Sequence, residues 1–153
     1  MKSNHFSSVD GSGLRVAIVA SRFNQELCDA LVADAVAALH GAAVAPESID
    51  IVRVPGSFEL PVMANKLASS KKYDAIICLG VLIKGDTKHD QYIANAVAQG
   101  LTLVSIQTGI PVAFGVLTTE TKEQAEVRAL GSQKKGWEAA MSAIETVRAL
   151  QLD

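Results

Sequence analysis

Cysteine is scarce in this 153-residue chain, and the two that occur, Cys28 and Cys78, form no Cys-x-x-Cys motif. Both lie within apolar stretches, so we interpret them as buried, inert thiols and not as a redox pair. The N-terminus also lacks the charged head and apolar core of a signal peptide. These features favour a reducing compartment, and we expect a cytoplasmic protein.

Long hydrophobic runs and clusters of basic residues are missing as well. Hydrophobic residues make up 49% of the chain and the mean hydropathy is +0.25, yet no apolar run is long enough to cross a bilayer. The 14 Lys and Arg residues are dispersed among 16 Asp and Glu residues, which gives no electrostatic footprint for nucleic acid. Membranes and nucleic acids are therefore not expected as partners. One core of this size cannot hide so much apolar surface, so we expect a homo-oligomer.

Sequence patterns for metal binding, covalent catalysis and ATP binding are also absent. The three histidines, His5, His40 and His89, are too scattered for a metal-ligand spacing, and no paired carboxylates accompany them. There is no Gly-x-Ser-x-Gly elbow and no Walker loop. We predict no metal and no cofactor.

Four short runs rich in Val and Ile stand out against these absences. They read as parallel strands that are buried on both faces, because polar residues hardly interrupt them. Their ranges are 14–20, 49–54, 73–79 and 111–116.

Segments with helical spacing of apolar residues alternate with these strands. The stripes fall within 27–38, 93–104 and 137–147, and Thr121 with Gln124 makes a capping box for a further short helix. Alternating strands and helices predict a doubly wound α/β sheet with helices on both sides.

The chain reads as one domain, because no linker, repeat or low-complexity segment divides it. Residues 1–12 are polar and form an N-terminal arm, and residues 13–153 form the α/β domain. The sequence leaves open whether the arm is loose or docks on a neighbouring subunit.

Ligands of open parallel sheets bind outside the carboxyl ends of the strands, and the first two connections there carry distinctive residues. Phe23 and Asn24 follow the first strand, and Asn24 is a natural N-cap for the next helix. A loop phenylalanine more often covers the local core, but it can also stack on a ligand. After the second strand, Gly56 permits close backbone approach to a ligand. Glu59 either accepts hydrogen bonds from a polyol or complements a helix dipole.

The third connection, 80–89, is the richest in functional groups. Gly85 permits unusual backbone angles, Thr87 offers a hydroxyl, and the amides of the following helix N-terminus form a ready anion site. His89 lies at the same helix mouth and is the best general acid/base candidate. We therefore infer that this connection binds a phosphate or carboxylate group.

In this order and spacing, several segments resemble the active-site segments of the lumazine synthase family. The resemblance covers essentially the whole chain after the arm. The segments are Arg22-Phe23-Asn24, Pro55-Gly56-Ser57-Phe58-Glu59, Gly85-Asp86-Thr87-Lys88-His89, Phe114-Gly115-Val116-Leu117-Thr118 and Lys135-Gly136-Trp137.

The resemblance implies a flavodoxin-like three-layer sandwich and a riboflavin-pathway enzyme. Members of the family condense 5-amino-6-(ribitylamino)uracil with 3,4-dihydroxy-2-butanone 4-phosphate to give 6,7-dimethyl-8-ribityllumazine and phosphate. By resemblance, Phe23 stacks on the pyrimidine, Glu59 and the backbone of Ser57 hold the ribityl chain, 85–87 bind the phosphate, and His89 moves protons. The other substrate-binding residues that the resemblance implies are Asn24, Gly56, Phe58, Val81, Leu82, Ile83, Gly85, Asp86 and Thr87.

The family completes each active site with residues from the adjacent subunit. By resemblance these are Phe114, Arg128, which pairs with the phosphate, and Lys135, which reaches the pyrimidine. The resemblance thus implies self-assembly as a pentamer, a dimer of pentamers or an icosahedral shell of sixty subunits, with riboflavin synthase as a further candidate partner.

Two departures from the family pattern leave points open. Asp90 and Gln91 follow His89 where family members usually carry an aromatic residue, which alters the charge beside the histidine. The loop 129–134 is about one residue shorter than the common one, so Lys134 is an alternative to Lys135. The same loop is associated in the family with assembly size.

Two other functions fit part of the pattern. A non-catalytic shell or carrier protein for flavin or lumazine needs the same stacking and phosphate groups, but it needs neither His89 as a proton shuttle nor Arg128 as a clamp on a leaving phosphate. A sugar-phosphate enzyme of the same fold, such as an isomerase, needs no aromatic platform like Phe23.

Overall fold

The computed structural model describes residue 6 and residues 9–152, and its centre is a four-stranded parallel sheet. The strands lie in the order β2-β1-β3-β4, which is the order of a flavodoxin-like sheet without a fifth strand. This confirms the predicted fold class. The strands are β1 (Val16–Ser21), β2 (Ile49–Val54), β3 (Ala75–Ile83) and β4 (Val112–Thr119).

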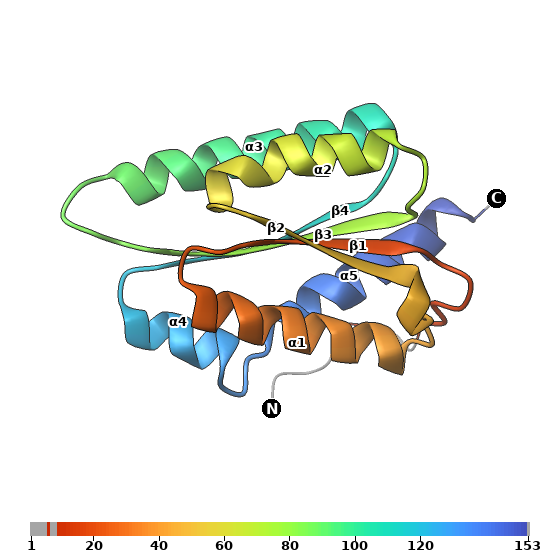
Figure 1. Ribbon diagram of the computed structural model, residues 1–153, viewed down its shortest axis with the longest axis horizontal. Coiled ribbons are helices and arrows are strands. Elements are labelled where there is room, and N and C mark those ends of the chain that lie inside the picture. The colour runs from red at the N-terminus through yellow and green to blue at the C-terminus, as the bar shows by residue number, and fades with distance from the viewer. Residues whose placement is uncertain (1–5, 7–8, 153) are drawn as a thin grey trace.

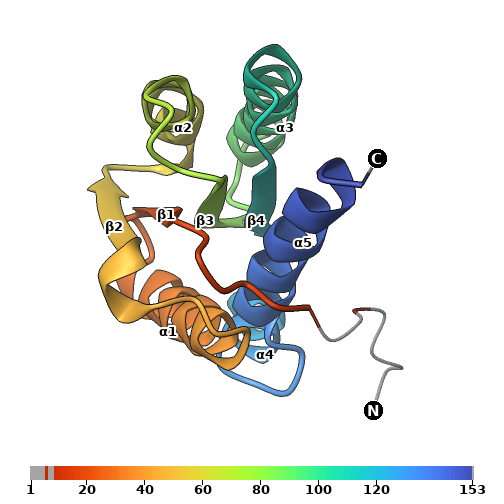
Figure 2. The same cartoon turned by 90° about the vertical axis from the view of Figure 1, so that its right-hand side faces the viewer.

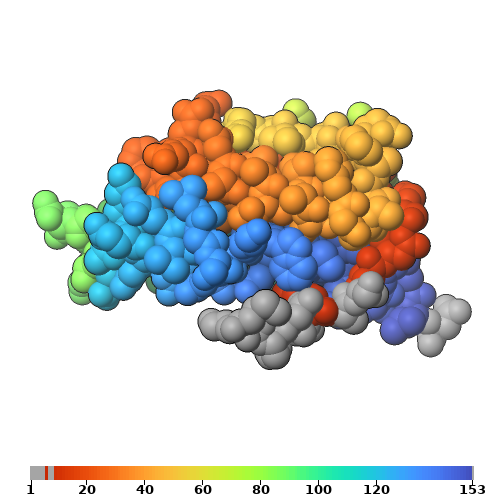
Figure 3. Space-filling model, turned by 90° about the horizontal axis from the view of Figure 1, so that it is seen from below, coloured from red at the N-terminus to blue at the C-terminus, as the bar shows by residue number. Residues whose placement is uncertain are grey.

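Helices cover both faces of the sheet, which gives the three layers seen in Figure 1 and Figure 2. Two helices, α2 (Leu60–Ser69) and α3 (His89–Thr108), lie on one face. The opposite face carries α1 (Gln25–Gly41), α4 (Lys122–Ala129) and α5 (Lys135–Leu150). Seen from below in Figure 3, α1 lies alongside α4 and α5. Two short 3₁₀ turns, η1 (Pro46–Ser48) and η2 (Ser57–Glu59), flank β2.

The sheet separates two hydrophobic cores, and successive strand residues face them alternately. Ile18 in β1 packs into the core under α1 and α5, whereas its neighbour Val19 packs into the core under α2 and α3. Both side chains are completely buried. Burial on both faces is the physical reason for the nearly unbroken apolar runs of β1 and β3. The prediction of the same burial for β2 is wrong, because this edge strand is only partly buried and Ile51 is 48% exposed.

The structure extends β3 and β4 beyond the predicted ends. Val81 pairs with Leu117 and Ile83 pairs with Thr119, so these residues belong to the sheet and not to a connecting loop. The prediction ended the third strand at residue 79 and assigned 80–89, beginning with Gly80, to the connection after it. Mutual pairing of the two strands outweighs the low strand preference of one glycine.

The last residues of the predicted arm dock on the same chain. Arg148 of α5 donates hydrogen bonds to the carbonyl oxygens of Asp10 (2.8 Å) and Ser12 (3.0 Å). The N–H of Gly11 donates to the carbonyl oxygen of Ala42. The remainder of the arm, apart from Phe6 and Val9, lies outside the described residues.

Both cysteines are free and buried, as predicted. Burial raises the pKa of the Cys28 thiol and of the Cys78 thiol above their ordinary value, which makes both poor nucleophiles. Among the described residues, no helix is long and apolar enough to cross a membrane.

Candidate active site

A cavity lies at the carboxyl ends of β1, β2 and β3. Because β1 and β3 are neighbours but the chain leaves them in opposite directions across the sheet, this is the topological switch point at which such folds bind ligands. The cavity has a volume of about 760 Å³. Its walls are Phe23, Asn24, Pro55, Gly56, Ser57, Phe58, Glu59, Val81, Leu82, Ile83, Gly85, Thr87, His89, Asp90, Tyr92 and Ile93.

Backbone hydrogen bonds hold the connection after β1 against the connection after β2. The N–H of Arg22 donates to the carbonyl oxygen of Val54 (2.8 Å), and the N–H of Phe23 donates to that of Pro55 (3.1 Å). The Phe23 ring has no place in the core, since 71% of the residue is exposed. Of the two interpretations of this phenylalanine, the lid on the core is therefore wrong. An exposed ring at a cavity wall can stack on a planar ligand.

Asn24 occupies the predicted N-cap position of α1, but its side chain does not cap the helix. The residue has a left-handed backbone (φ 60°, ψ 49°), which asparagine tolerates better than most residues. Its Nδ2 instead donates to the carbonyl oxygen of Val81 at 2.9 Å. Asn24 therefore anchors the first connection to β3 and fixes the place of the neighbouring Phe23.

The close approach of the turn η2 to β3 depends on Gly80, which the sequence analysis did not select. A Cβ atom at this position would lie 2.4 Å from Ser57 Oγ and 3.3 Å from Ser21 Oγ. Only a glycine lets the turn η2 approach β3 this closely. Ser57 Oγ is buried and has no hydrogen-bond partner among the described residues.

Glu59 ends η2 and stands at the N-cap of α2, so it suits both roles that the sequence left open. A Cβ atom at Gly56 would lie 4.0 Å from both oxygens of this carboxylate. Because Gly56 has no side chain, a ligand can approach the Glu59 carboxylate from this direction. Phe58 beside it is 63% exposed and adds a second aromatic ring to the wall.

The third connection leads into α3 as predicted, but the reason given for Gly85 was wrong. Gly85 does not have a positive φ, and a Cβ atom there would meet no atom within 4 Å. Thr87 Oγ1 accepts a long hydrogen bond (3.3 Å) from the N–H of His89, the first residue of α3. A bound anion could replace this weak acceptor, and the exposed His89 side chain lies beside it.

The other three predicted residues line a second cavity of about 380 Å³. Phe114 of β4, Arg128 of α4 and Lys135 of α5 all line it. Arg128 donates through one guanidinium nitrogen to the carbonyl oxygen of Gln124 (2.9 Å), and Lys135 forms an ion pair with Glu138 (2.9 Å).

Lys135, and not Lys134, lines this second cavity. Lys134 precedes α5 with a left-handed backbone (φ 44°, ψ 59°) and is exposed. The sequence analysis missed Glu138, although its spacing of three residues from Lys135 on a helix was the signal for a pair.

Fifteen of the sixteen predicted residues thus line one of two cavities, and Asp86 alone lies on neither wall. The two cavities share no residue, because the first lies at the carboxyl ends of β1, β2 and β3 and the second lies along β4, α4 and α5. The sequence analysis missed Tyr92 and Ile93 of the first cavity. Their spacing of three and four residues after His89 on a helix would have indicated them.

Comparison with known proteins tests the family resemblance directly. Residues 13–151 match the family model of 6,7-dimethyl-8-ribityllumazine synthase. The chain belongs to this family.

Three relatives named 6,7-dimethyl-8-ribityllumazine synthase are similar to this chain over nearly their full length. The enzyme of Syntrophus aciditrophicus (strain SB) is 46% identical over 140 residues, which cover 91% of each chain. That of Desulfatibacillum aliphaticivorans is 45% identical over 141 residues, 92% of this chain and 91% of the relative. That of Xanthomonas oryzae pv. oryzae (strain PXO99A) is 48% identical over 139 residues, 90% of each chain.

Proposed function

We propose that this protein condenses 5-amino-6-(ribitylamino)uracil with 3,4-dihydroxy-2-butanone 4-phosphate to give 6,7-dimethyl-8-ribityllumazine, phosphate and water in riboflavin biosynthesis. The observation that carries the proposal is the shared cavity of Phe23, Glu59 and His89 at the switch point of a chain that belongs to this family. The exposed ring of Phe23 suits the pyrimidine, and the carboxylate of Glu59 suits the ribityl chain. His89 lies at the N-terminus of α3, which suits the phosphate.

The main contribution of such a site is to hold two substrates together. The pyrimidine amine attacks the ketone to form an imine with loss of one water, phosphate departs, and the second nitrogen attacks the remaining carbonyl carbon and closes the ring with loss of a second water. Correct positioning replaces roughly 7–11 kcal/mol of the barrier. Proton transfer by His89 adds about 10²- to 10⁴-fold, so this residue assists the reaction without being indispensable.

The 85–87 loop, the N-terminus of α3 and Arg128 stabilise the negative charge on the departing phosphate. Because Arg128 lines the second cavity, which shares no residue with the first, a second copy of the chain supplies it to the site. Each complete site then lies between two subunits.

Exposed apolar side chains support this assembly. Val62 and Ile106 are 70% and 74% exposed, and burial of such groups between subunits removes them from water. The family resemblance favours pentamers, alone, paired or as a shell, in the cytoplasm.

The proposal is tested with both substrates and purified protein, by following lumazine fluorescence and phosphate release. We expect stoichiometric products from the wild type and a loss of about 10²- to 10³-fold in Arg128→Ala, which removes one donor from the departing charge. Binding of the pyrimidine without acceleration over the spontaneous reaction would instead support the carrier or shell function.

A complementation experiment tests the shared site. Phe23→Ala damages only the first cavity and Arg128→Ala only the second, so co-assembled subunits contain some intact sites. When equal amounts of the two variants assemble at random into a closed ring, about one quarter of the sites combine an intact Phe23 with an intact Arg128 from the neighbouring subunit. Activity that stays at the level of the separate variants, in oligomers shown to be mixed, would exclude a site between subunits.

A further inference from the structure

The second cavity holds two cations and one carboxylate, and the carboxylate pairs with only one of the cations. Arg128, Lys135 and Glu138 all line this cavity, and Glu138 is the only acidic residue among its described walls. Lys135 Nζ donates a 2.9 Å hydrogen bond to Glu138 Oε2 within α5. No ion pair between described residues includes Arg128, whose guanidinium donates to the neutral carbonyl oxygen of Gln124. The charge of Lys135 is therefore compensated, whereas that of Arg128 is not.

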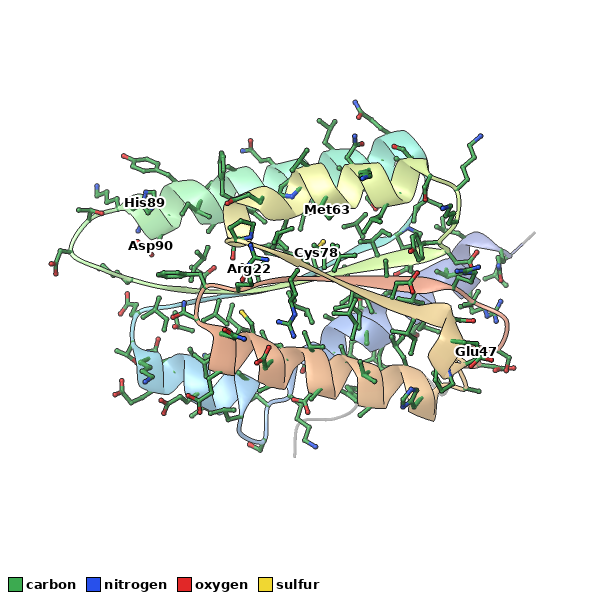
Figure 4. The ribbon with its side chains drawn as sticks, in the orientation of Figure 1. Arg22, Glu47, Met63, Cys78, His89 and Asp90 are labelled. Carbon is green, nitrogen blue, oxygen red and sulfur yellow. The ribbon has the colours of Figure 1, made fainter. Side chains whose placement is uncertain are left out.

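Neither stability nor the dipole of α5 explains the pairing. About a third of each side chain in the pair is exposed (32% for Lys135 and 39% for Glu138), and such pairs add little to stability. A carboxylate in the first turn of α5 complements the helix dipole equally well without a lysine beside it. In Figure 4, His89 lies at the tip of α3, across the sheet from α5, so the general acid/base candidate of the same chain takes no part in this pair. What the pairing changes is the kind of ligand that Lys135 attracts.

The carboxylate distinguishes between charged and neutral ligands of this cavity. Both cations line one space of about 380 Å³, so a phosphate group that reaches Arg128 also comes close to Lys135. A carboxylate 2.9 Å from the ammonium repels a phosphate dianion and cancels most of the attraction of the ammonium. A neutral carbonyl group is not repelled in this way. Because the ammonium has three N–H donors and Glu138 accepts from one of them, Lys135 can still donate to a carbonyl oxygen.

This inference rests on the proposed function, in which one substrate carries a phosphate and the other carries a neutral uracil ring with carbonyl groups. We propose that Glu138 suppresses the attraction of Lys135 for phosphate, so that the phosphate binds at Arg128 and Lys135 binds the pyrimidine. The same hydrogen bond restricts the flexible lysine side chain and fixes the place of its ammonium. Glu138 is thus a positioning residue that separates the two substrates without contact with either.

The test measures how inorganic phosphate affects binding of the pyrimidine substrate. The dissociation constant of 5-amino-6-(ribitylamino)uracil is determined by calorimetric titration with and without excess inorganic phosphate, at constant ionic strength. The second substrate is left out, so no turnover occurs. The measured quantity is the factor by which phosphate weakens pyrimidine binding, because general effects on stability or affinity cancel in this ratio.

Three variants are compared with the assembled wild type. Glu138→Gln keeps the shape of the side chain and removes its charge, Glu138→Asp keeps a carboxylate, and Glu138→Gln/Lys135→Met also removes the ammonium. In the wild type the factor should be close to one, because phosphate leaves Lys135 to the pyrimidine. Glu138→Gln should raise it by about tenfold, the size of a hydrogen bond between charged groups, because phosphate now competes at Lys135. Glu138→Asp should stay nearer to the wild type.

The double variant separates this role from a merely structural one. Its factor should return to about one, because phosphate has lost the ammonium that it gained in Glu138→Gln. A disturbance of folding or packing would not depend on Lys135 in this way. The matched control is Glu126→Gln, which removes the acid of the exposed pair with Lys122 and lies on neither cavity wall. It should keep the wild-type factor.

Two results would overturn the inference alone. One is an unchanged factor in Glu138→Gln, and the other is an increase that persists in the double variant. A wild type that binds the pyrimidine but forms no lumazine with both substrates would overturn the proposed function, and the factor in Glu138→Gln would still decide the role of Glu138. A wild type that does not bind the pyrimidine would overturn both.

Discussion

Asn24 Nδ2 donates a 2.9 Å hydrogen bond to the carbonyl oxygen of Val81, and this bond joins two walls of the candidate active site. Phe23 directly precedes Asn24, and the N–H of Phe23 donates a hydrogen bond to the carbonyl oxygen of Pro55. The aromatic platform is thus fixed from two strands, although most of its ring is exposed.

Replacement of Asn24 separates two effects, the side-chain hydrogen bond and the left-handed backbone. Asn24→Gly loses only the bond, because glycine adopts a positive φ without strain, and should destabilise the protein by about 1 kcal/mol. Asn24→Ala adds backbone strain of about 1 kcal/mol or more. Both variants should raise the KM for the pyrimidine substrate, since Phe23 becomes mobile. Denaturant titration and steady-state kinetics check this, and an alanine variant as stable as the glycine variant would contradict it.

Gly80→Ala should distort the turn η2 against β3. The new methyl group would lie 2.4 Å from Ser57 Oγ, and overpacking of this kind costs about 1–3 kcal/mol. Ser57→Ala should remove most of that clash at little cost, because the hydroxyl that it deletes is buried without a partner. The double variant should therefore be more stable than Gly80→Ala. Additive free energies of unfolding for the two changes would show that the clash is relieved elsewhere.

Local patterns in the sequence predicted the fold and the strand connections that line the first cavity, and the family resemblance supplied the other predicted cavity residues. Apolar runs buried on two faces identify parallel strands, and parallel strands place their following connections at one edge of the sheet. Phe23, Glu59 and His89 could be grouped on that rule alone, and the structure brings them to one cavity.

Features that depend on contacts between distant segments could not be predicted. Nothing near Gly80 in the sequence indicates that Ser57 would press against it, and nothing near Asn24 indicates that its side chain would prefer Val81 to its own helix. Each of these is decided by tertiary packing.

Lys135 and Lys134 are neighbours whose replacement should have different results. Lys135→Met removes a charge from the wall of the second cavity and should lower kcat/KM by about tenfold or more. Its stability should change by less than about 1 kcal/mol, because the pair with Glu138 is partly exposed. Lys134→Asn removes the same charge outside the cavity and keeps a residue type that tolerates its left-handed backbone. Equal losses of activity in both variants would indicate a general charge effect.

The buried thiols should make the protein less stable at high pH. Burial raises the pKa of Cys28 and of Cys78 above the ordinary value of 9.0, so the folded state keeps protons that the unfolded chain releases. The stabilisation is complete below about pH 9 and is lost as the pH rises toward the folded-state pKa, by about 1.4 kcal/mol per pH unit for each thiol.

Free energies of unfolding measured from pH 7 to 10.5 should therefore fall less steeply in Cys78→Ala than in the wild type. Tyrosine and lysine titrations are common to both proteins and cancel in the difference between the two curves. Neither thiol should react with a water-soluble disulfide reagent at pH 8 until the protein is unfolded, when both should react. Parallel curves for the two proteins, or rapid labelling of the folded wild type, would show that water reaches the Cys78 side chain in solution.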